Sequence, residues 1–208
     1  MFGTKILEER KSKFNGNLRV VRSFALGTYI QADGLTQSGG IVESIWKDTL
    51  HRVRNLNHKI RNVLILGLGG GTVANLIRKK WPEAKITGVD IDPIIVELGE
   101  KYLGLDRDGI EMKIGDAPQI IKQFKNKRFD LIIVDLYNGD KFPAKFESSN
   151  FLSFARGGLA NGGIVIFNRL FYKEKKAEAL EFGKKLQQSF SKVEYFYPHV
   201  NIMFICGD

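Results

Sequence analysis

From residue 61 onwards, short runs of consecutive apolar residues alternate with longer segments in which apolar residues recur every three or four positions. The short runs lack polar alternation, which is typical of parallel strands buried on both faces. The longer segments have the period of amphipathic helices. We expect strands over 63–66, 86–89, 110–114, 131–134 and 163–167. Helices are expected between them: one that ends near 81, two that begin at 93 and 116, and one over 149–159. A further helix is expected after the last of these strands, over 173–190. The pattern predicts an α/β chain built on a parallel sheet.

The end of the chain adds two further strands, over 193–197 and 201–206. Only Pro198, His199 and Val200 separate them, which is too short for a crossover helix. The two strands must therefore form an antiparallel hairpin at the edge of the sheet. A mostly parallel seven-stranded sheet with a closing antiparallel hairpin resembles the Rossmann-like fold of class I methyltransferases.

The first 40 residues differ from the rest. Strands are expected over 5–9, 18–22 and 28–32, with turn signals at 15–17 and 33–34, and a helix is expected over 41–54. This portion is too small for a core of its own, so it is expected to pack on the region after it. We divide the chain into a small N-terminal β-strand region with a lead-in helix, 1–54, and a Rossmann-like domain, 55–208.

A glycine-rich loop comes after the first strand of the alternating region. Gly67, Gly69 and Gly71 permit a tight turn, and the helix after them offers unpaired amide N–H groups. Thr72 stands where the dinucleotide fingerprint has its last glycine. The loop therefore predicts a nucleotide-like ligand without a pyrophosphate.

Acidic residues come after the next two strands. Asp90 ends the second strand, 23 positions after Gly67 (90 − 67), where a carboxylate can accept hydrogen bonds from ribose hydroxyls. Asp92, which precedes Pro93, is better explained as a helix N-cap. Asp116 comes after the third strand and has two interpretations that remain open together: a helix cap, or a partner for an adenine amino group.

Asp135 comes directly after the apolar strand 131–134, at the mouth of the expected site. A carboxylate there could orient or deprotonate an attacking amine, which makes Asp135 the candidate catalytic residue. Tyr137, Asn138 and Asp140 come shortly after it and are candidates for binding the acceptor substrate.

Together these motifs resemble the spermidine synthase-like branch of class I methyltransferase-fold proteins, from about Gln37 to the C-terminus. The matching segments are Val63–Thr72, Val89–Pro93, Gly115–Ala117, Phe129–Asp135 and Leu159–Val165. The resemblance implies S-adenosylmethionine or its decarboxylated form as the donor. It implies that Asp90 holds ribose, that Asp116 and Ala117 meet adenine, and that Gln37 closes over the donor. It makes a homodimer a candidate assembly.

The acceptor side departs from the polyamine enzymes. Their Tyr-His-Glu cluster falls on Ile45-Trp46-Lys47, and their second acid and proline fall on Asn138 and Gly139, although Asp140 lies next to them. The first hypothesis is therefore methyl transfer to an amine or similar nucleophile, with Lys47 or a loop amide holding the donor carboxylate. The alternatives are aminopropyl transfer to a polyamine, and a catalytically silent module that binds nucleic acid or protein.

Charge and composition add little to this choice. The net charge of +9 would suit an anionic partner such as nucleic acid, but no nucleic-acid motif accompanies it. One cysteine, Cys206, excludes an internal disulfide and a cysteine-rich metal site, and no metal is expected. No long apolar run or secretory leader is present, so we expect a soluble cytoplasmic protein.

Overall fold

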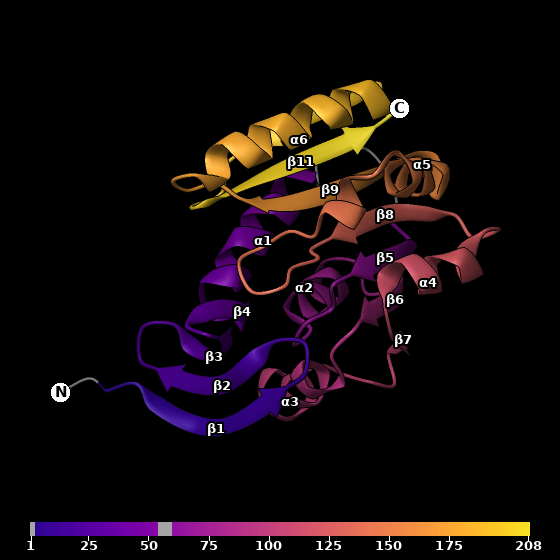
Figure 1. Ribbon diagram of the computed structural model, residues 1–208. Coiled ribbons are helices and arrows are strands. Elements are labelled where there is room, and N and C mark those ends of the chain that lie inside the picture. Colours follow the sequence, from indigo (N-terminus) through magenta and orange to yellow (C-terminus); the bar gives the residue numbers. More distant parts are fainter. Residues whose placement is uncertain (1–2, 54–59) are drawn as a thin grey trace.

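The computed structural model describes residues 3–53 and 60–208, which form two sheets and the helices around them (Figure 1). The N-terminal sheet is antiparallel, in the order β1 (Lys5–Ser12), β2 (Gly16–Ser23), β3 (Gly27–Ala32) and β4 (Leu35–Gly39). Helix α1 (Gly40–Val53) leads from it to the larger sheet. The strand β4 was not expected; it pairs with β3 across the Asp33-Gly34 turn, where both residues have positive φ.

The larger sheet has seven strands in the order β10-β11-β9-β8-β5-β6-β7. The strands are β5 (Asn62–Leu66), β6 (Lys85–Asp90), β7 (Ile110–Ile114), β8 (Phe129–Val134), β9 (Leu159–Leu170), β10 (Lys192–Phe196) and β11 (Asn201–Gly207). Strands β5 to β9 pair in parallel, whereas β11 is antiparallel to both β9 and β10. The predicted Rossmann-like sheet with its closing hairpin is confirmed.

Helices cover both faces of this sheet, and successive strand residues point to opposite faces. The helices are α2 (Thr72–Lys80), α3 (Pro93–Leu103), α4 (Ala117–Ile120), α5 (Ser149–Gly157) and α6 (Lys175–Ser189), with short 3₁₀ turns η1 (Ile121–Phe124) and η2 (Ala144–Glu147). Val63 and Ile65 join the core under α1, α2 and α3, whereas Leu64 and Leu66 join the core under α4, α5 and α6. Burial on both faces explains the unbroken apolar runs.

The N-terminal sheet shares the first of these cores. Leu18, Val20 and Ile30 are fully buried in the cluster that contains Trp46 and Val63. The expectation that this portion packs on the rest of the chain is thus confirmed. The proposed boundary at residue 54 falls outside the described residues, and the division at that point stays a prediction.

Three helix predictions need correction at their ends. The helix predicted over 149–159 ends at Gly157, because strand β9 already begins at Leu159 rather than at 163. Lys173 has a positive φ, so α6 begins two residues later than predicted. The helix after Asp116 is a single α-helical turn continued by η1. Within the described ranges, no helix combines the length and apolar character needed to cross a membrane.

Candidate active site

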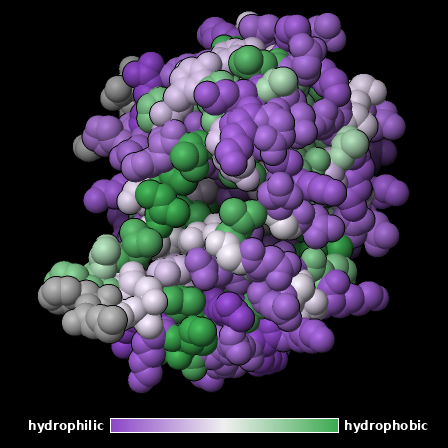
Figure 2. Space-filling view, turned by 60° about the vertical axis from the view of Figure 1, so that its left-hand side comes forward, coloured by the Kyte–Doolittle hydropathy of each residue, from purple (hydrophilic) through white to green (hydrophobic). Residues whose placement is uncertain are grey.

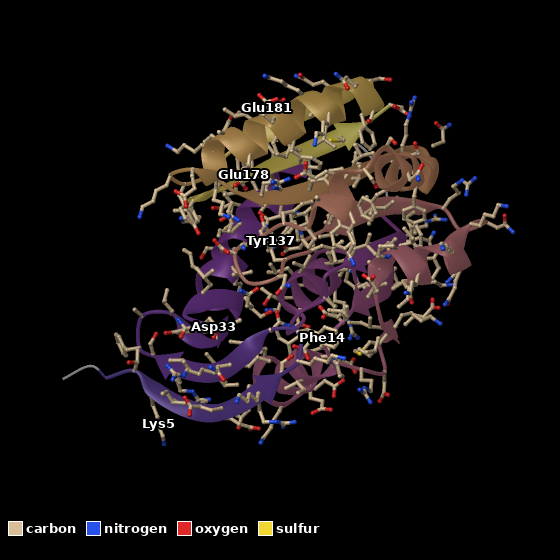
Figure 3. All side chains as sticks on the ribbon, in the orientation of Figure 1. Lys5, Phe14, Asp33, Tyr137, Glu178 and Glu181 are labelled. Carbon is tan, nitrogen blue, oxygen red and sulfur yellow. The ribbon has the colours of Figure 1, made fainter. Side chains whose placement is uncertain are left out.

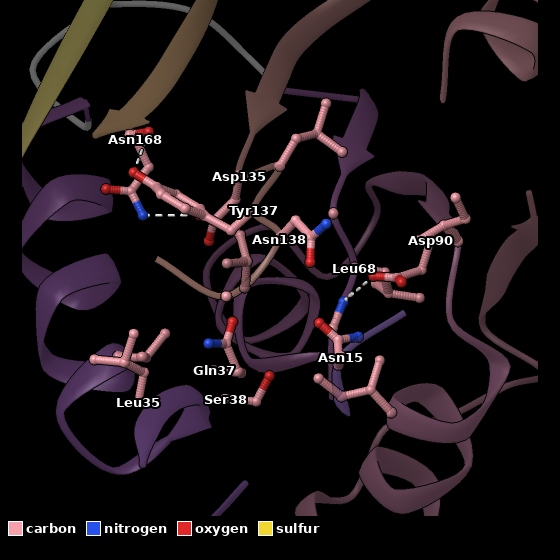
Figure 4. Close-up of a pocket in the computed structure, with 18 of the residues that line it drawn as sticks. Asn15, Leu35, Gln37, Ser38, Leu68, Asp90, Asp135, Tyr137, Asn138 and Asn168 are labelled. Atoms are coloured by element: carbon pink, nitrogen blue, oxygen red, sulfur yellow. Dashed lines mark hydrogen bonds between the residues drawn. The ribbon is translucent and has the colours of Figure 1, made fainter. Parts of the chain in front are cut away.

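A pocket of about 530 Å³ lies at the carboxyl edge of the larger sheet. Strands β5 to β9 end there, and the antiparallel β11 begins there, so all six contribute residues to its wall or floor. This edge is where open α/β sheets bind their ligands. The face brought forward in Figure 2 is hollowed, and apolar residues border the hollow. Figure 4 shows Asp90 and Leu68 on one side of the pocket, and Asp135, Tyr137 and Asn168 on the other.

The glycine loop joins three strands at the floor of the pocket. The amides of Gly67 and Leu68 donate to the carbonyl of Val89, at 2.9 and 3.0 Å. Gly67 has φ +89°, and a Cβ at this position would overlap the carbonyl oxygen of Asp135. Gly67 and Gly69 line the pocket, but Gly71 packs against Leu105 and is not among the lining residues that the structure describes.

Asp90 lies beside the loop, as predicted from its place at the end of β6. Its Oδ2 accepts from the Gly69 amide at 2.7 Å, and its Oδ1 accepts from the Asp92 amide at 2.9 Å. Burial of the carboxyl raises its pKa to about 6. Each carboxylate oxygen has two lone-pair directions, so Asp90 retains acceptor capacity toward the pocket. The geometry is suited to a pair of ribose hydroxyls, a role that stays a prediction.

Asp92 is a helix cap, and it also anchors the N-terminal sheet. Its Oδ1 accepts from the Ile94 amide at 2.9 Å, which confirms the N-cap. Its Oδ2 accepts from Ser12 Oγ at 2.5 Å and from Asn15 Nδ2 at 2.6 Å, both in or beside the β1–β2 turn. These bonds hold residues 13–15 against the pocket, which they line. The contribution of this turn was not predicted from the sequence.

Asp116 occupies the N-cap position of α4 without capping it. Its side chain makes no capping hydrogen bond, and both carboxylate oxygens accept from Lys145 Nζ, at 2.7 and 2.8 Å. The helix-cap interpretation is therefore wrong for the side chain, because the lysine of η2 competes successfully for the carboxylate. Asp116, Ala117 and Lys145 all line the pocket, so the adenine interpretation stays a prediction.

Asp135 is the centre of a hydrogen-bonded chain. Its Oδ2 accepts from the Trp46 indole N–H at 3.1 Å, and its Oδ1 accepts from Asn168 Nδ2 at 2.8 Å. The oxygen of Asn168 accepts in turn from Asn201 Nδ2 at 2.8 Å. Loss of solvent around the carboxyl raises its pKa to about 6, although both hydrogen bonds lower it. Asp135 thus combines an ionised form at neutral pH with a pKa suited to proton transfer.

The acceptor candidates after Asp135 have different positions. Tyr137 and Asn138 line the pocket, as does Gln37 from β4. The Tyr137 hydroxyl donates to the Asn168 carbonyl at 3.2 Å and accepts from the Leu170 amide at 2.8 Å. Asp140 pairs with Lys175 at 3.3 Å and does not line the pocket. The suggestion that Lys47 meets the donor is wrong, because its side chain is exposed outside the pocket.

Asn168 and Asn201 were not predicted as site residues. Asn168 comes after the apolar strand 163–167 just as Asp135 comes after 131–134, so the same signal was available for it. Asn201 begins an antiparallel strand, which brings it to the same edge of the sheet. Among residues 3–53 and 60–208, no group of three or more His, Cys, Asp or Glu side chains is placed to hold a metal ion.

Asn168→Leu should shift the pH dependence of activity. Removing the Nδ2 donor is expected to raise the pKa of Asp135 above about 6, so the acid limb of kcat/KM should move up by about 0.5–1 pH unit. A pH profile of kcat/KM measures this shift. Asn62→Leu, at the exposed amino end of β5, is a matched control that should leave the limb in place. An unmoved limb in Asn168→Leu would exclude Asp135 as the titrating group.

Comparison with known proteins agrees with the fold and places the chain in a family. Residues 43–204 match the family model of the spermine/spermidine synthase domain. Relatives include a polyamine aminopropyltransferase of Vibrio vulnificus, 30% identical over 54% of this chain and 38% of the relative. Another, from Hydrogenobaculum, is 28% identical over 93% of this chain and 70% of the relative. The chain thus matches little more than a third of the Vibrio protein's length.

Solved structures show the same fold. A spermidine synthase in complex with the transition state analogue AdoDATO aligns with a TM-score of 0.80 at 19% identity, covering 97% of this chain and 72% of that one. Human methyltransferase-like protein 13 in complex with SAH aligns with a TM-score of 0.65 at 21% identity, covering 80% and 81%. The fold is thus that of class I methyltransferase-like proteins. Within it, this chain belongs to the spermine/spermidine synthase domain family.

Proposed function

We propose that this protein transfers an alkyl group from the sulfonium centre of an adenosyl donor to an amine, and that the group is aminopropyl, from decarboxylated S-adenosylmethionine. The carboxylate of Asp135 is the observation that carries the proposal. It lies across the pocket from Asp90, is held by two neutral donors, and has no ion-pair partner in the described part of the chain. A carboxylate so placed attracts a cationic amine and aligns it with the donor.

The reaction needs few groups because the sulfonium is already activated. The amine nitrogen attacks the carbon bonded to sulfur, and the electron pair of the breaking C–S bond goes to sulfur, which leaves as a neutral thioether. The amine arrives as an ammonium, so it first gives one proton to Asp135, which frees the lone pair that attacks; the alkylated nitrogen then carries the positive charge that the sulfonium has lost. In this proposal Asp90 holds the ribose, Asp116 and Ala117 lie at the adenine, and Tyr137 and Asn138 border the acceptor. Gln37 and the loop at Gly67 and Gly69 complete the donor side.

The scarcity of cations in the pocket favours the decarboxylated donor. An intact S-adenosylmethionine carries a carboxylate, which needs a cation or amide donor when bound. The lining lysines that the structure describes are Lys13 and Lys145, and Lys145 already pairs with Asp116. The family match and the relatives named aminopropyltransferases support the same choice. This reverses the order of the first two hypotheses drawn from the sequence.

Methyl transfer is the second candidate, and one observation favours it. A polyamine acceptor carries two or more ammonium groups, but Asp135 is the carboxylate that the described pocket offers on the acceptor side. A methyltransferase acting on an amine with one charge would need no more than this.

Titration calorimetry with the two donors tests the proposal. We expect decarboxylated S-adenosylmethionine to bind at least about tenfold more tightly than the intact form, because the latter leaves its carboxylate poorly paired. Asp90→Asn should weaken both donors by about tenfold to a hundredfold, since it removes charge-assisted acceptors for the ribose. Asp140→Asn, outside the pocket, is the matched control. Tighter binding of the intact donor would favour methyl transfer.

A further inference from the structure

We propose, building on the transfer to an amine proposed above, that the natural acceptor is a primary amine with one positive charge and an unbranched apolar chain. The acceptor half of the pocket is the part on the far side of Asp135 from Asp90. It is bordered by the ends of β8, β9 and β11 and by the first turns of α1. Its chemistry differs from that of the donor half, and this difference carries the inference.

Apolar side chains form much of the acceptor half. Ile41, Val42 and Ile45 come from the first two turns of α1, Leu170 ends β9, and Val200 lies in the turn just before β11. Ile45 belongs to the buried core, and Trp46 beside it is fully buried with its indole N–H on Asp135. These side chains give an aliphatic chain a surface to bury, and each buried methylene strengthens binding by about fourfold.

Acidic groups are scarce in the same half. The lining acids in the described structure are Asp90, Asp116 and Asp135, and the first two lie at the ends of β6 and β7 on the donor side. Asp140 is paired with Lys175 outside the lining. Glu178 and Glu181 lie on α6 (Figure 3), are not among the lining residues, and pair with lysines of their own helix.

A second ammonium group would therefore face neutral groups. Asp135 satisfies the reacting amine, and the remaining polar side chains nearby are amides and tyrosines such as Asn138, Asn201 and Tyr172. An ammonium removed from water without a carboxylate partner binds unfavourably. A diamine must meet this cost at its far end, whereas an alkylamine of the same length places a methyl group there.

A matched acceptor pair tests the inference with the wild-type protein. n-Butylamine and 1,4-diaminobutane share one carbon chain and differ by one amino group. With decarboxylated S-adenosylmethionine, and separately with the intact form, we expect kcat/KM for n-butylamine to exceed that for the diamine by at least about tenfold. Mass spectrometry of the alkylated products and of the released thioether measures transfer.

The outcomes separate this inference from the function on which it rests. A preference for 1,4-diaminobutane would overturn the single-charge acceptor and leave amine alkylation standing. Transfer to no amine with either donor would overturn both. A substitution in α1 supplies an independent measurement. Val42 is suited to it because this residue lies one turn before Trp46 and faces the pocket.

Val42→Glu should give the acceptor half its missing carboxylate. We expect the diamine-to-monoamine ratio of kcat/KM to rise by about tenfold in this variant. Ser44→Glu adds the same charge to an exposed position of α1 outside the pocket, and should leave the ratio unchanged. An equal rise in both variants, or none in a folded Val42→Glu, would contradict the inference. The wild-type acceptor pair decides the question if Val42→Glu does not fold.

Discussion

Asp135→Asn is expected to lower kcat/KM by about 10²–10⁴-fold while the protein stays folded. The substitution removes the charge that attracts the amine and the base that takes its proton, but it keeps the size of the side chain. Transfer assays at saturating donor measure the loss, and donor affinity by calorimetry should remain close to wild type. Unchanged transfer would remove Asp135 from the mechanism.

The same variant is expected to be more stable than the wild type above pH 6. The pKa of Asp135 is about 6 in the folded protein, whereas the ordinary pKa of an aspartate is 3.8, so folding disfavours the charged form. A raised carboxyl pKa means that stability is lost as pH rises through about 6, and is retained below about 4. Asparagine does not ionise, so the variant does not lose this stability as the pH rises.

The gain in the free energy of unfolding of Asp135→Asn is at most about 3 kcal/mol, which corresponds to a pKa shift of about two units. It will be smaller because the asparagine oxygen cannot serve both Trp46 and Asn168 as the carboxylate does. Urea unfolding at pH 4 and pH 8 gives the comparison. A variant whose stability relative to wild type is lower at pH 8 than at pH 4 would contradict the burial of a charged Asp135.

Gly67→Ala is expected to destabilise the protein by about 3 kcal/mol or more. A side chain at φ +89° carries a backbone cost of about 1–2 kcal/mol, and the new Cβ would also overlap the Asp135 carbonyl. The backbone shift needed to relieve that overlap would move the Asp135 carboxylate as well. Chemical unfolding and kcat/KM should therefore both respond.

Gly139→Ala is the matched control for this substitution. Gly139 also has a positive φ, +62°, but a Cβ there meets nothing within 4 Å. It should show only the backbone cost, about 1–2 kcal/mol. Equal losses in the two variants would mean that the close approach of the loop to β8 contributes nothing.

The central part of the fold could be predicted because its cause is local. Residues 63–66 and 131–134 are apolar throughout since both faces of their strands are buried, and that property is visible in the sequence. A polar residue that ends such a strand must lie at the carboxyl edge, which is why Asp90 and Asp135 were found. The same rule applied to Asn168 would have found it too.

The remainder of the site depends on contacts between distant segments. Asp116 had a good local reason to cap a helix, but Lys145, 29 positions later, takes its carboxylate. Thr36, Gln37 and Ser38 are polar and lack a strand pattern, and β4 forms because a hairpin turn returns them to β3. Tertiary packing determines such pairings, and a short stretch of sequence carries no information about contacts with distant segments.

The buried carboxylate of Asp92 has a consequence for how the protein can be shortened or divided. It accepts hydrogen bonds from Ser12 and Asn15, which lie 80 and 77 positions earlier in the chain, and its own side chain is fully buried. Removing the first hairpin would take away the part of the pocket wall formed by residues 13–15 and leave the Asp92 carboxylate with only the Ile94 amide as a partner. The N-terminal sheet is therefore not a detachable appendage: a version of the seven-stranded sheet and its helices made without it would have to be redesigned at Asp92 before it could be expected to fold.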